Sequence, residues 1–284
     1  MSNPPGSDAR IAVLLSAALA GARAIMAIYA SDFTIERKRD GSPVSEADRR
    51  AEDAIVAQLS AAMPDIAVVA EEAVSGGARP DIGRDFVLVD PLDGTKEFAG
   101  RNGEFTVNIA LVEDGAPVAG IVLAPALGLA YAGAADGAWK GRTDDRLDAV
   151  RDWAAIHIRP AENAPVAVAS RSHMTPETEA ALAQAGAGET RAIGSSLKFC
   201  LVAEAAADLY PRLGPTMEWD IAAGDAVLRA AGGIVVTLDG SPLRYGKAEV
   251  PGQRAFENPH FIAAGDRALI ERLDLSTLKA TRAA

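Results

Sequence analysis

The chain has 284 residues, of which 49% are hydrophobic and 24% are charged, and this composition excludes an intrinsically disordered protein. Its formal net charge of -11 argues against binding to a nucleic-acid polymer, because that binding depends on clustered Lys and Arg side chains. The single cysteine, Cys200, excludes an intramolecular disulfide and a metal site made of several cysteines, as expected for a protein of the reducing cytoplasm.

The first predicted element is an amphipathic helix over residues 11–29. Residues 18–20 read Ala-Leu-Ala and imitate the cleavage site of a secretory signal, but Asp8 beside Arg10 does not give the positive charge with which a signal begins. Because Arg23 interrupts the apolar run, that run is shorter than the roughly 20 residues that a bilayer span needs. We therefore expect a helix of the folded core and no transmembrane segment.

A second helix is predicted over residues 48–63, where apolar positions recur at helical spacing. The pattern from Ser45 to Asp48 matches a capping box at the start of this helix. Two apolar runs follow, at residues 66–72 and 85–90, and each ends in acidic residues. Such runs are typical of buried strands, so the sequence places carboxylates at the ends of strands.

Residues 105–141 are rich in Val and Ile and contain two Asp-Gly turns, which predicts an antiparallel meander. Residues 143–165 lead out of the meander and are the best candidate for a domain boundary. From Val166 onward, predicted strands and helices alternate, which is typical of an α/β unit. We therefore predict a layered α/β protein, with an α+β domain at residues 1–160, an α/β domain at residues 161–284 and a site in the cleft between them.

The stretch LVDPLDGTKEF at residues 88–98 places two aspartates three apart where a buried strand stops. Because Pro91 fixes its own backbone turn, the carboxylates of Asp90 and Asp93 can converge with the carbonyl of Leu92 on one point. Mg²⁺ prefers oxygen ligands of these two kinds, so the stretch indicates half of a magnesium site. For this motif taken alone, the alternative is a surface turn in which the aspartates only cap a helix.

Further residues extend the interpretation of a magnesium site. Gly94 and Thr95 would stand at a helix N-terminus, whose free N–H groups and positive dipole end favour a phosphate. Other acids lie at the ends of other predicted elements, namely Glu71, Glu72 and Asp220. A metal cluster assembled from separate segments requires such a distribution.

A family resemblance is carried by the acidic pair at residues 71–72, by DPLDGTKEF and RNGEFTVNIALV within residues 90–112, and by EWDIAAGDAVLRAAGG at residues 218–233. These segments resemble the inositol monophosphatase superfamily of Mg²⁺-dependent, lithium-sensitive phosphatases, and the agreement covers nearly the whole chain. Residues 194–220 more closely resemble its CysQ branch, the 3′(2′),5′-bisphosphate nucleotidases. The resemblance implies the fold of that family, in which helical and sheet layers alternate.

The resemblance also implies a set of metal ligands. One Mg²⁺ would bind Glu71, Asp90 and the carbonyl of Leu92. A second Mg²⁺ would share Asp90 and would add Asp93 and Asp220. Two cations placed in this way stabilise both the attacking and the leaving oxygen of an in-line displacement at phosphorus.

A third, weaker ion would touch Glu71 and waters held by Asp48, so the resemblance implies two to three ions per site. In the family mechanism, Thr95 and the region of Asp48 activate the attacking water. From spacing alone, Asp48 would simply complete the capping box that begins at Ser45. Glu72 is expected to lie behind the ligands or in solvent.

Arg212 distinguishes this chain from the inositol-hydrolysing relatives, which carry a glutamate at the corresponding place before a Trp-Asp pair. An arginine there favours a second phosphate, because a guanidinium forms paired charge-assisted hydrogen bonds with phosphate oxygens. Lys198 and the turn at Gly194, Ser195 and Ser196 would supply further contacts to a ribose or a phosphate. The alternative for Arg212 is a solvated cation at the end of a strand.

The resemblance implies a phosphatase that removes the 3′-phosphate of adenosine 3′,5′-bisphosphate, a by-product of sulfate activation, and releases AMP. Two alternatives stay open, namely a phosphatase of inositol or sugar phosphates and a noncatalytic module that binds metal and nucleotide. A homodimer and a peripheral position at the inner membrane also stay open. Three residues of the motif at residues 218–233 have no assigned role at this point: Glu218, Ile221 and Asp225.

Overall fold

The computed structural model describes residues 8–31, 36–37, 43–44, 46–171, 174–248 and 254–278. Ser45, the first residue of the predicted capping box, lies outside these residues. Besides the elements described below, the chain forms a short pair of strands, β1 (Glu36–Arg37) and β2 (Pro43–Val44).

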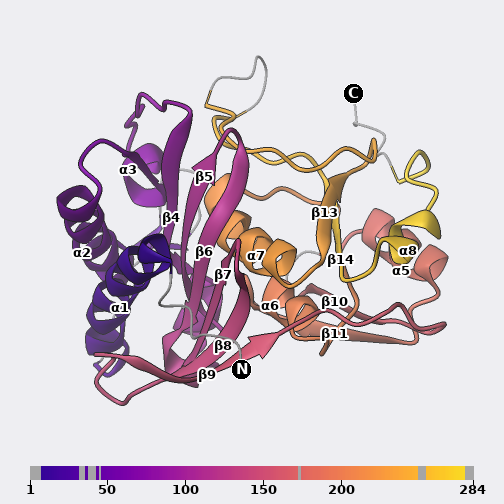
Figure 1. Ribbon diagram of the computed structural model, residues 1–284, viewed down its shortest axis with the longest axis horizontal. Helices are drawn as coiled ribbons and strands as arrows, with labels where there is room; N and C mark the ends of the chain where they lie inside the picture. The colour runs from indigo at the N-terminus through magenta and orange to yellow at the C-terminus, as the bar shows by residue number, and fades with distance from the viewer. Residues whose placement is uncertain are drawn as a thin grey trace.

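Two long helices form the outermost layer at the N-terminal side. Helix α1 (Ala9–Tyr29) and helix α2 (Glu46–Ala62) pack against each other and cover one face of a large sheet (Figure 1). Helix α1 is long and apolar enough to cross a membrane by length and composition, and half of its most apolar stretch is buried inside the fold. This packing against α2 and the sheet supports a core helix, and the absence of a transmembrane segment stays a prediction.

The large sheet has seven strands in the order β3-β4-β5-β6-β7-β8-β9. Strand β3 pairs with β4 in parallel, and every later pair is antiparallel. The predicted meander is therefore confirmed. The bounds of the strands are β3 (Ala67–Ala70), β4 (Asp85–Asp93), β5 (Thr106–Glu113), β6 (Ala116–Ala124), β7 (Leu129–Ala134), β8 (Gly137–Thr143) and β9 (Val150–Ile156).

Strand β9 corrects the interpretation of residues 143–165 as a simple exit from the meander. Residues 150–156 pair with β8 and form the edge of the seven-stranded sheet. Most side chains of β9 are exposed, so its sequence shows neither an apolar run nor a regular alternation. The connection between the two sheets is therefore limited to residues 157–165.

The second sheet has five strands in the order β11-β10-β12-β14-β13. Strand β10 is parallel to β11 and β12, whereas β14 is antiparallel to both of its neighbours, so the sheet is mixed. The bounds are β10 (Val166–Ser170), β11 (Glu189–Ile193), β12 (Leu209–Arg212), β13 (Ile234–Thr237) and β14 (Phe261–Ala264).

The remaining helices complete the layers. Helices α6 (Leu197–Ala203) and α7 (Glu218–Ala230) lie between the two sheets, whereas α5 (Pro176–Ala185) and α8 (Arg267–Glu271) cover the far face of the five-stranded sheet (Figure 1). The layers thus alternate as helix, sheet, helix, sheet and helix. The predicted layered α/β fold is confirmed.

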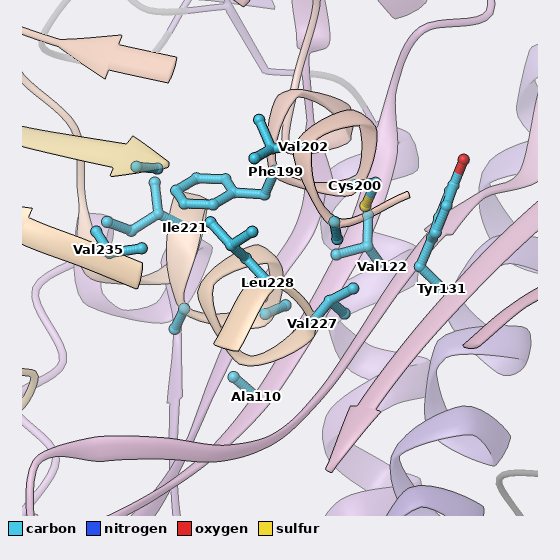
Figure 2. Packing of buried hydrophobic residues seen from close by; sticks show 14 of the residues in the cluster. Ala110, Val122, Tyr131, Phe199, Cys200, Val202, Ile221, Val227, Leu228 and Val235 are labelled. Carbon is cyan, nitrogen blue, oxygen red and sulfur yellow. The ribbon is translucent and has the colours of Figure 1, made fainter. Parts of the chain in front are cut away.

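One hydrophobic core joins the two sheets through the central helices. Figure 2 shows Val122 and Tyr131 of the large sheet and Val235 of the small sheet on opposite sides of side chains from α6 and α7, and all three belong to one cluster. This core contains residues from both sides of the predicted boundary at residue 160. The division into domains at residues 1–160 and 161–284 therefore stays a prediction.

Helix α7 lies unusually close to the large sheet, and two glycines permit the approach. A Cβ atom on Gly133 would come within 2.5 Å of the Cα of Val227, and one on Gly120 would come within 2.7 Å of the carbonyl oxygen of Ala223. No side chain fits at such distances. The close packing fixes α7, which carries Asp220, against the sheet that carries Asp90.

Candidate active site

The end of β4 is shaped by an irregularity in its pairing with β5. Asp90 pairs with Asn108 and Asp93 pairs with Thr106, so β4 has one more residue than β5 between the two pairs. Pro91 lies in this bulge, where its missing N–H does not interrupt a regular ladder. The N–H of Leu92 instead donates to a carboxylate oxygen of Asp90 at 3.0 Å, which fixes the orientation of that carboxylate.

A short helix, α4 (Thr95–Ala99), begins directly after the bulge, as the sequence predicted. Gly94 precedes it with φ 89°, a left-handed conformation that favours glycine, and a Cβ atom there would come within 3.3 Å of the Glu104 carbonyl oxygen. The hydroxyl of Thr95 donates to the Leu92 carbonyl at 3.4 Å. Thr95 therefore lies beside one of the predicted metal ligands, while its predicted role and that of Gly94 in phosphate binding stay predictions.

Three of the predicted ligands meet in space although they are far apart in the sequence. Glu71 is the first residue of helix α3 (Glu71–Ser75), which follows β3, while Asp90 lies on β4 and Asp220 on α7. Each of these carboxylates offers an oxygen atom, and the three oxygens lie within 4.8 Å of one another. The backbone N–H of Met217 donates to a carboxylate oxygen of Asp220 at 2.8 Å.

Burial and mutual repulsion dominate the electrostatics of this cluster. Burial, followed by the charges of Asp93 and Glu71, raises the pKa of Asp220 well above its usual range. Burial also raises the pKa of Asp93, against the opposing effect of the nearby Lys198 ammonium. Several carboxylates held together in a partly buried place are costly unless a cation neutralises them. Their oxygen atoms are the donors that Mg²⁺ prefers, so the residues fit this ion.

Asp48 lies in the first turn of α2 and is buried, with 2% of its surface exposed. One helical turn later, the carboxylate of Glu52 accepts the backbone N–H of Glu72 at 2.7 Å and that of Ala73 at 2.8 Å. Glu52 thereby ties the helix of Asp48 to the N-terminus of the helix that carries Glu71. Sequence reasoning missed Glu52, although its position four residues after Asp48, on the same helix face, was a signal.

The predicted substrate-side turn lies against the other half of the chain. The N–H of Gly194 donates to a carboxylate oxygen of Glu104 at 2.9 Å, and a Cβ atom on Gly194 would come within 2.6 Å of the Glu97 Cγ. Ser195 adopts φ 47°, which is uncommon for a residue with a side chain. Its hydroxyl is buried and has no hydrogen-bond partner among the described residues. The contact of Gly194 and Ser195 with substrate stays a prediction.

Lys198 is buried and turned inward. Its ammonium donates to the carbonyls of Ser195 and, at 3.4 Å, Ile193, and lies 5.3 Å from the centre of the Tyr210 ring. Burial lowers the pKa of Lys198 to about 8, while the charge of Asp93 acts in the opposite direction. The ammonium thus belongs to the electrostatic surroundings of the carboxylate cluster, and a direct contact with substrate stays a prediction.

Arg212 ends β12 and is only 7% exposed, so its alternative interpretation as a solvated strand-end cation is wrong. One of its terminal nitrogens donates to the Pro215 carbonyl at 2.7 Å. Its Nε is buried without a hydrogen-bond partner among the described residues. Such a donor retains capacity for an acceptor such as a phosphate oxygen.

The structure also gives roles to two residues that the sequence left unassigned. Glu218 is fully buried, and its carboxylate accepts the N–H of Gly246 at 2.8 Å and that of Lys247 at 2.9 Å. It therefore anchors a loop and does not face solvent. Asp225 is also buried, and it pairs with Arg229 at 2.6 Å and accepts the Tyr245 hydroxyl at 2.8 Å.

Ile221, the third unassigned residue, is buried in the core cluster that joins the two sheets. The side chain that follows Asp220 on α7 thus packs into apolar surroundings. A hydrophobic residue suits this position, which explains the isoleucine on packing grounds.

A model of the inositol monophosphatase family matches residues 8–275. The chain belongs to the inositol monophosphatase family. This membership confirms the resemblance that the sequence motifs indicated. A solved inositol monophosphatase from Zymomonas mobilis is similar, with a TM-score of 0.74 and 28% identity over 95% of this chain and 98% of that chain.

Relatives of this chain that are named 3′(2′),5′-bisphosphate nucleotidase CysQ are more similar to it in sequence than the Zymomonas mobilis protein is. The one from Escherichia coli (strain K12) is 45% identical over 240 residues, which cover 84% of this chain and 92% of the relative. The one from Buchnera aphidicola is 38% identical over 84% of this chain and 88% of the relative. The crystal structure of CysQ from Bacteroides thetaiotaomicron has a TM-score of 0.71 and 39% identity over 90% of this chain and 97% of that chain.

Proposed function

We propose that this protein is a Mg²⁺-dependent phosphatase that removes the 3′-phosphate of adenosine 3′,5′-bisphosphate and yields AMP and phosphate. The observation that carries the proposal is the cluster of Glu71, Asp90 and Asp220, whose carboxylate oxygens lie within 4.8 Å of one another in a member of the inositol monophosphatase family. The substrate is supported by relatives with 45–46% identity over 84% of the chain, which are named as bisphosphate nucleotidases.

In the proposed site, Glu71, Asp90 and the Leu92 carbonyl would hold one Mg²⁺, and Asp90, Asp93 and Asp220 would hold a second. A third, more weakly held ion would bind beside Glu71, so the proposed site holds two to three ions. When bound, Mg²⁺ supplies Lewis-acid stabilisation of the charge on the phosphoryl oxygens and lowers the pKa of a coordinated water.

The chain's own residues would orient the reaction. The Thr95 hydroxyl, which is already directed at the Leu92 carbonyl, would position the attacking water, and Asp48 would accept a proton from it. The N–H groups of Gly94 and Thr95 would bind the phosphate at the start of α4. In-line attack requires the attacking water on one side of the phosphorus atom and the leaving 3′-oxygen of the ribose on the other.

The second phosphate of the substrate would bind on the side of Arg212. The unpaired Nε of this buried guanidinium, together with the ammonium of Lys198, gives a local positive charge within a chain of formal net charge -11. A neutral polyol gains little from two such cations, whereas a phosphate gains charge-assisted hydrogen bonds. The turn at Gly194 and Ser195 would line the ribose.

The direct test compares phosphate release from adenosine 3′,5′-bisphosphate, inositol 1-phosphate and fructose 1,6-bisphosphate, each with Mg²⁺ and with a chelator. A preference for the nucleotide that is lost on chelation supports the proposal. A preference for a sugar-like ester would keep the chemistry and overturn the substrate. No phosphate release from any of the three substrates would favour a noncatalytic module that binds metal and nucleotide.

The Arg212→Gln variant tests the substrate side separately. It should lower kcat/KM for the bisphosphate far more than for a 3′-monophosphate, because only the bisphosphate places a phosphate against Arg212. Equal losses on both substrates would remove Arg212 from substrate recognition.

The same proposal places the enzyme in the cytoplasm, where it would recycle a by-product of sulfate activation. Lithium inhibition, a homodimer and peripheral attachment to the inner membrane belong to the proposal as open points. Size-exclusion chromatography with light scattering and flotation with anionic vesicles would test the latter two.

A further inference from the structure

Asn108 is a buried polar residue inside the large sheet. It lies on β5 directly opposite Asp90, between the buried residues Val107 and Ile109, and 1% of its surface is exposed. A buried amide is unfavourable unless it is hydrogen-bonded, so its partners indicate why the residue stands there.

The partners of Asn108 belong to the surroundings of the carboxylate cluster. Its side-chain nitrogen donates to the Ser196 hydroxyl oxygen at 3.0 Å and to a carboxylate oxygen of Asp93 at 3.4 Å. The Ser196 hydroxyl in turn donates to the backbone carbonyl of Asp220. A chain of hydrogen bonds therefore runs from β4 through β5 and the start of α6 to α7.

The chemistry of these partners fixes the orientation of the amide. The ionised carboxylate of Asp93 can only accept hydrogen bonds. The Ser196 hydroxyl already donates its one hydrogen bond to the Asp220 carbonyl, so towards Asn108 it can only accept. Both positions therefore require the amide nitrogen of Asn108, whose oxygen is left buried without a partner among the described residues. The arrangement satisfies the groups around the cluster at the expense of the asparagine itself.

Ser196 is likewise diverted from its usual local role. It occupies the N-cap position of α6, where a serine hydroxyl ordinarily accepts a backbone N–H of the first turn, yet it makes no such bond. The hydroxyl bonds to Asn108 and Asp220 instead. Ser196 thus forgoes a local cap bond and Asn108 leaves its side-chain oxygen unpaired, and both contribute to the same network.

We propose that Asn108 and Ser196 are positioning residues for the metal site, which hold Asp93 and Asp220 in the spacing that a divalent cation requires. The inference rests on the proposed function, since it takes these aspartates as ligands. Asp93 and Asp220 repel each other, and they lie on two different elements, β4 and α7. Neutral donors between them restrain both without adding a charge that would compete with the ion.

The experiment measures binding of Mn²⁺ alone to the substrate-free protein, by electron paramagnetic resonance of the free ion. Ser196→Ala and Asn108→Leu should each weaken Mn²⁺ binding by about 10- to 100-fold, the range found for partners that orient metal ligands. Both residues belong to one chain of hydrogen bonds. The double variant should therefore bind Mn²⁺ only slightly more weakly than the single variant with the lower affinity. Ser196→Thr keeps the hydroxyl and should restore most of the affinity.

A matched control is Thr178→Val, which removes another buried hydroxyl, one that contacts the Thr175 hydroxyl at 3.1 Å on α5. It should leave Mn²⁺ affinity unchanged, so that a loss specific to Ser196→Ala separates positioning from general destabilisation. If Asn108→Leu does not fold, Ser196→Ala and Ser196→Thr still decide the question. Wild-type affinity in Ser196→Ala would overturn the inference alone, whereas absence of Mn²⁺ binding by the wild type would overturn the proposed function with it.

Discussion

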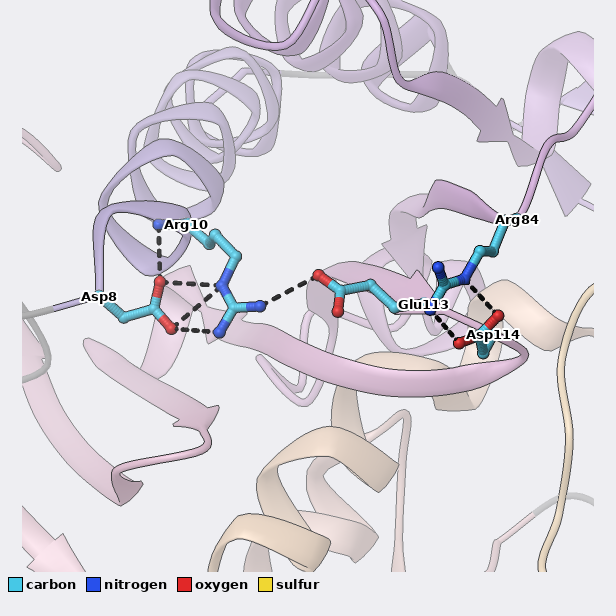
Figure 3. A network of polar contacts seen from close by, with 5 residues as sticks. All are labelled: Asp8, Arg10, Arg84, Glu113 and Asp114. Carbon is cyan, nitrogen blue, oxygen red and sulfur yellow. Dashed lines mark hydrogen bonds and ion pairs between the residues drawn. The ribbon is translucent and has the colours of Figure 1, made fainter.

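Acidic residues with opposite surroundings lie near the two ends of strand β4. At its start, Arg84 pairs with Asp114 in the turn between β5 and β6, and nearby Arg10 binds both Asp8 and Glu113 (Figure 3). At its end, Asp90 meets Glu71 and Asp220, and the adjacent cation, Lys198, is buried with a lowered pKa.

The pKa values separate the two groups of acids. Hydrogen bonds from Arg10 lower the pKa of Asp8, and hydrogen bonds from Arg84 lower that of Asp114. Burial raises the pKa of Asp93 and of Asp220 instead. An acid with its own arginine stays charged at little cost, whereas acids held together against repulsion store a cost that a bound cation relieves.

Removing one carboxylate from the cluster that meets at the end of β4 should have the largest effect on turnover. Asp220→Asn should lower kcat by about 100- to 1,000-fold, because losing a metal ligand removes several kcal/mol of transition-state stabilisation. The measurement is phosphate release under saturating Mg²⁺. An unchanged kcat would remove Asp220 from the site.

The same variant sharpens the comparison when its stability is measured in chelator. Asp220→Asn removes one of several mutually repelling, partly buried charges, so its thermal midpoint should rise above that of the wild type. A fall in the midpoint would show that the Asp220 carboxylate stabilises the fold even without a bound ion.

Addition of Mg²⁺ should stabilise the wild type at the end of β4. At a concentration of 100 times the dissociation constant, an ion that binds only the folded state adds about 2.7 kcal/mol to the free energy of unfolding. Urea unfolding with and without Mg²⁺ measures the increment, and Asp220→Asn should show a much smaller one. Equal increments in the two proteins would place the stabilising ion elsewhere.

A buried acid with its own arginine should stabilise the fold, in contrast to Asp220, and this stabilisation should depend on pH. Asp208 is 2% exposed, pairs with Arg159 at 2.6 Å and accepts the Val166 N–H at 2.7 Å. Burial alone would raise the pKa of Asp208, but the bonds from Arg159 and Val166 lower it overall. The carboxylate therefore stabilises the fold above its unfolded pKa of about 3.9, and this contribution is lost as the pH falls through the lower folded pKa.

Asp208→Asn should accordingly reduce the free energy of unfolding by about 1–2 kcal/mol at pH 7, since Arg159 is partly exposed and solvent screens the pair. The deficit should shrink as the pH falls below about 3.9. Urea unfolding of both proteins across this range gives the comparison. A deficit that grows toward low pH would contradict the sign of the argument.

The sequence predicted much of the fold because the buried elements repeat at clear spacings. The runs at residues 66–72 and 85–90 became β3 and β4, and the Asp-Gly turns marked the meander. Strand β9 was missed because an edge strand leaves most of its side chains in solvent. Its existence depends on its pairing with β8, which no local pattern encodes.

The candidate site was foreseen only in part for a related reason. The bulge at Asp90 and the left-handed Gly94 are local features of one motif, and the approach of Glu71 and Asp220 was implied by the family resemblance. Asn108 lies in an apolar strand with no partner near it in the sequence. Residues that support ligands through long-range hydrogen bonds leave no spacing signal, so the structure was needed to find them.

The smallest expected effect is at the start of β4. Arg84 and Asp114 form an exposed pair with two hydrogen bonds, far along the strand from Asp90. Arg84→Ala should leave phosphate release unchanged and should not shift the urea midpoint measurably at about 0.15 M salt, because water and salt screen exposed pairs. A small loss should emerge only at low ionic strength. A loss of turnover in this variant would break the comparison, since it would connect the arginine-paired acids with the acids that hold the ion.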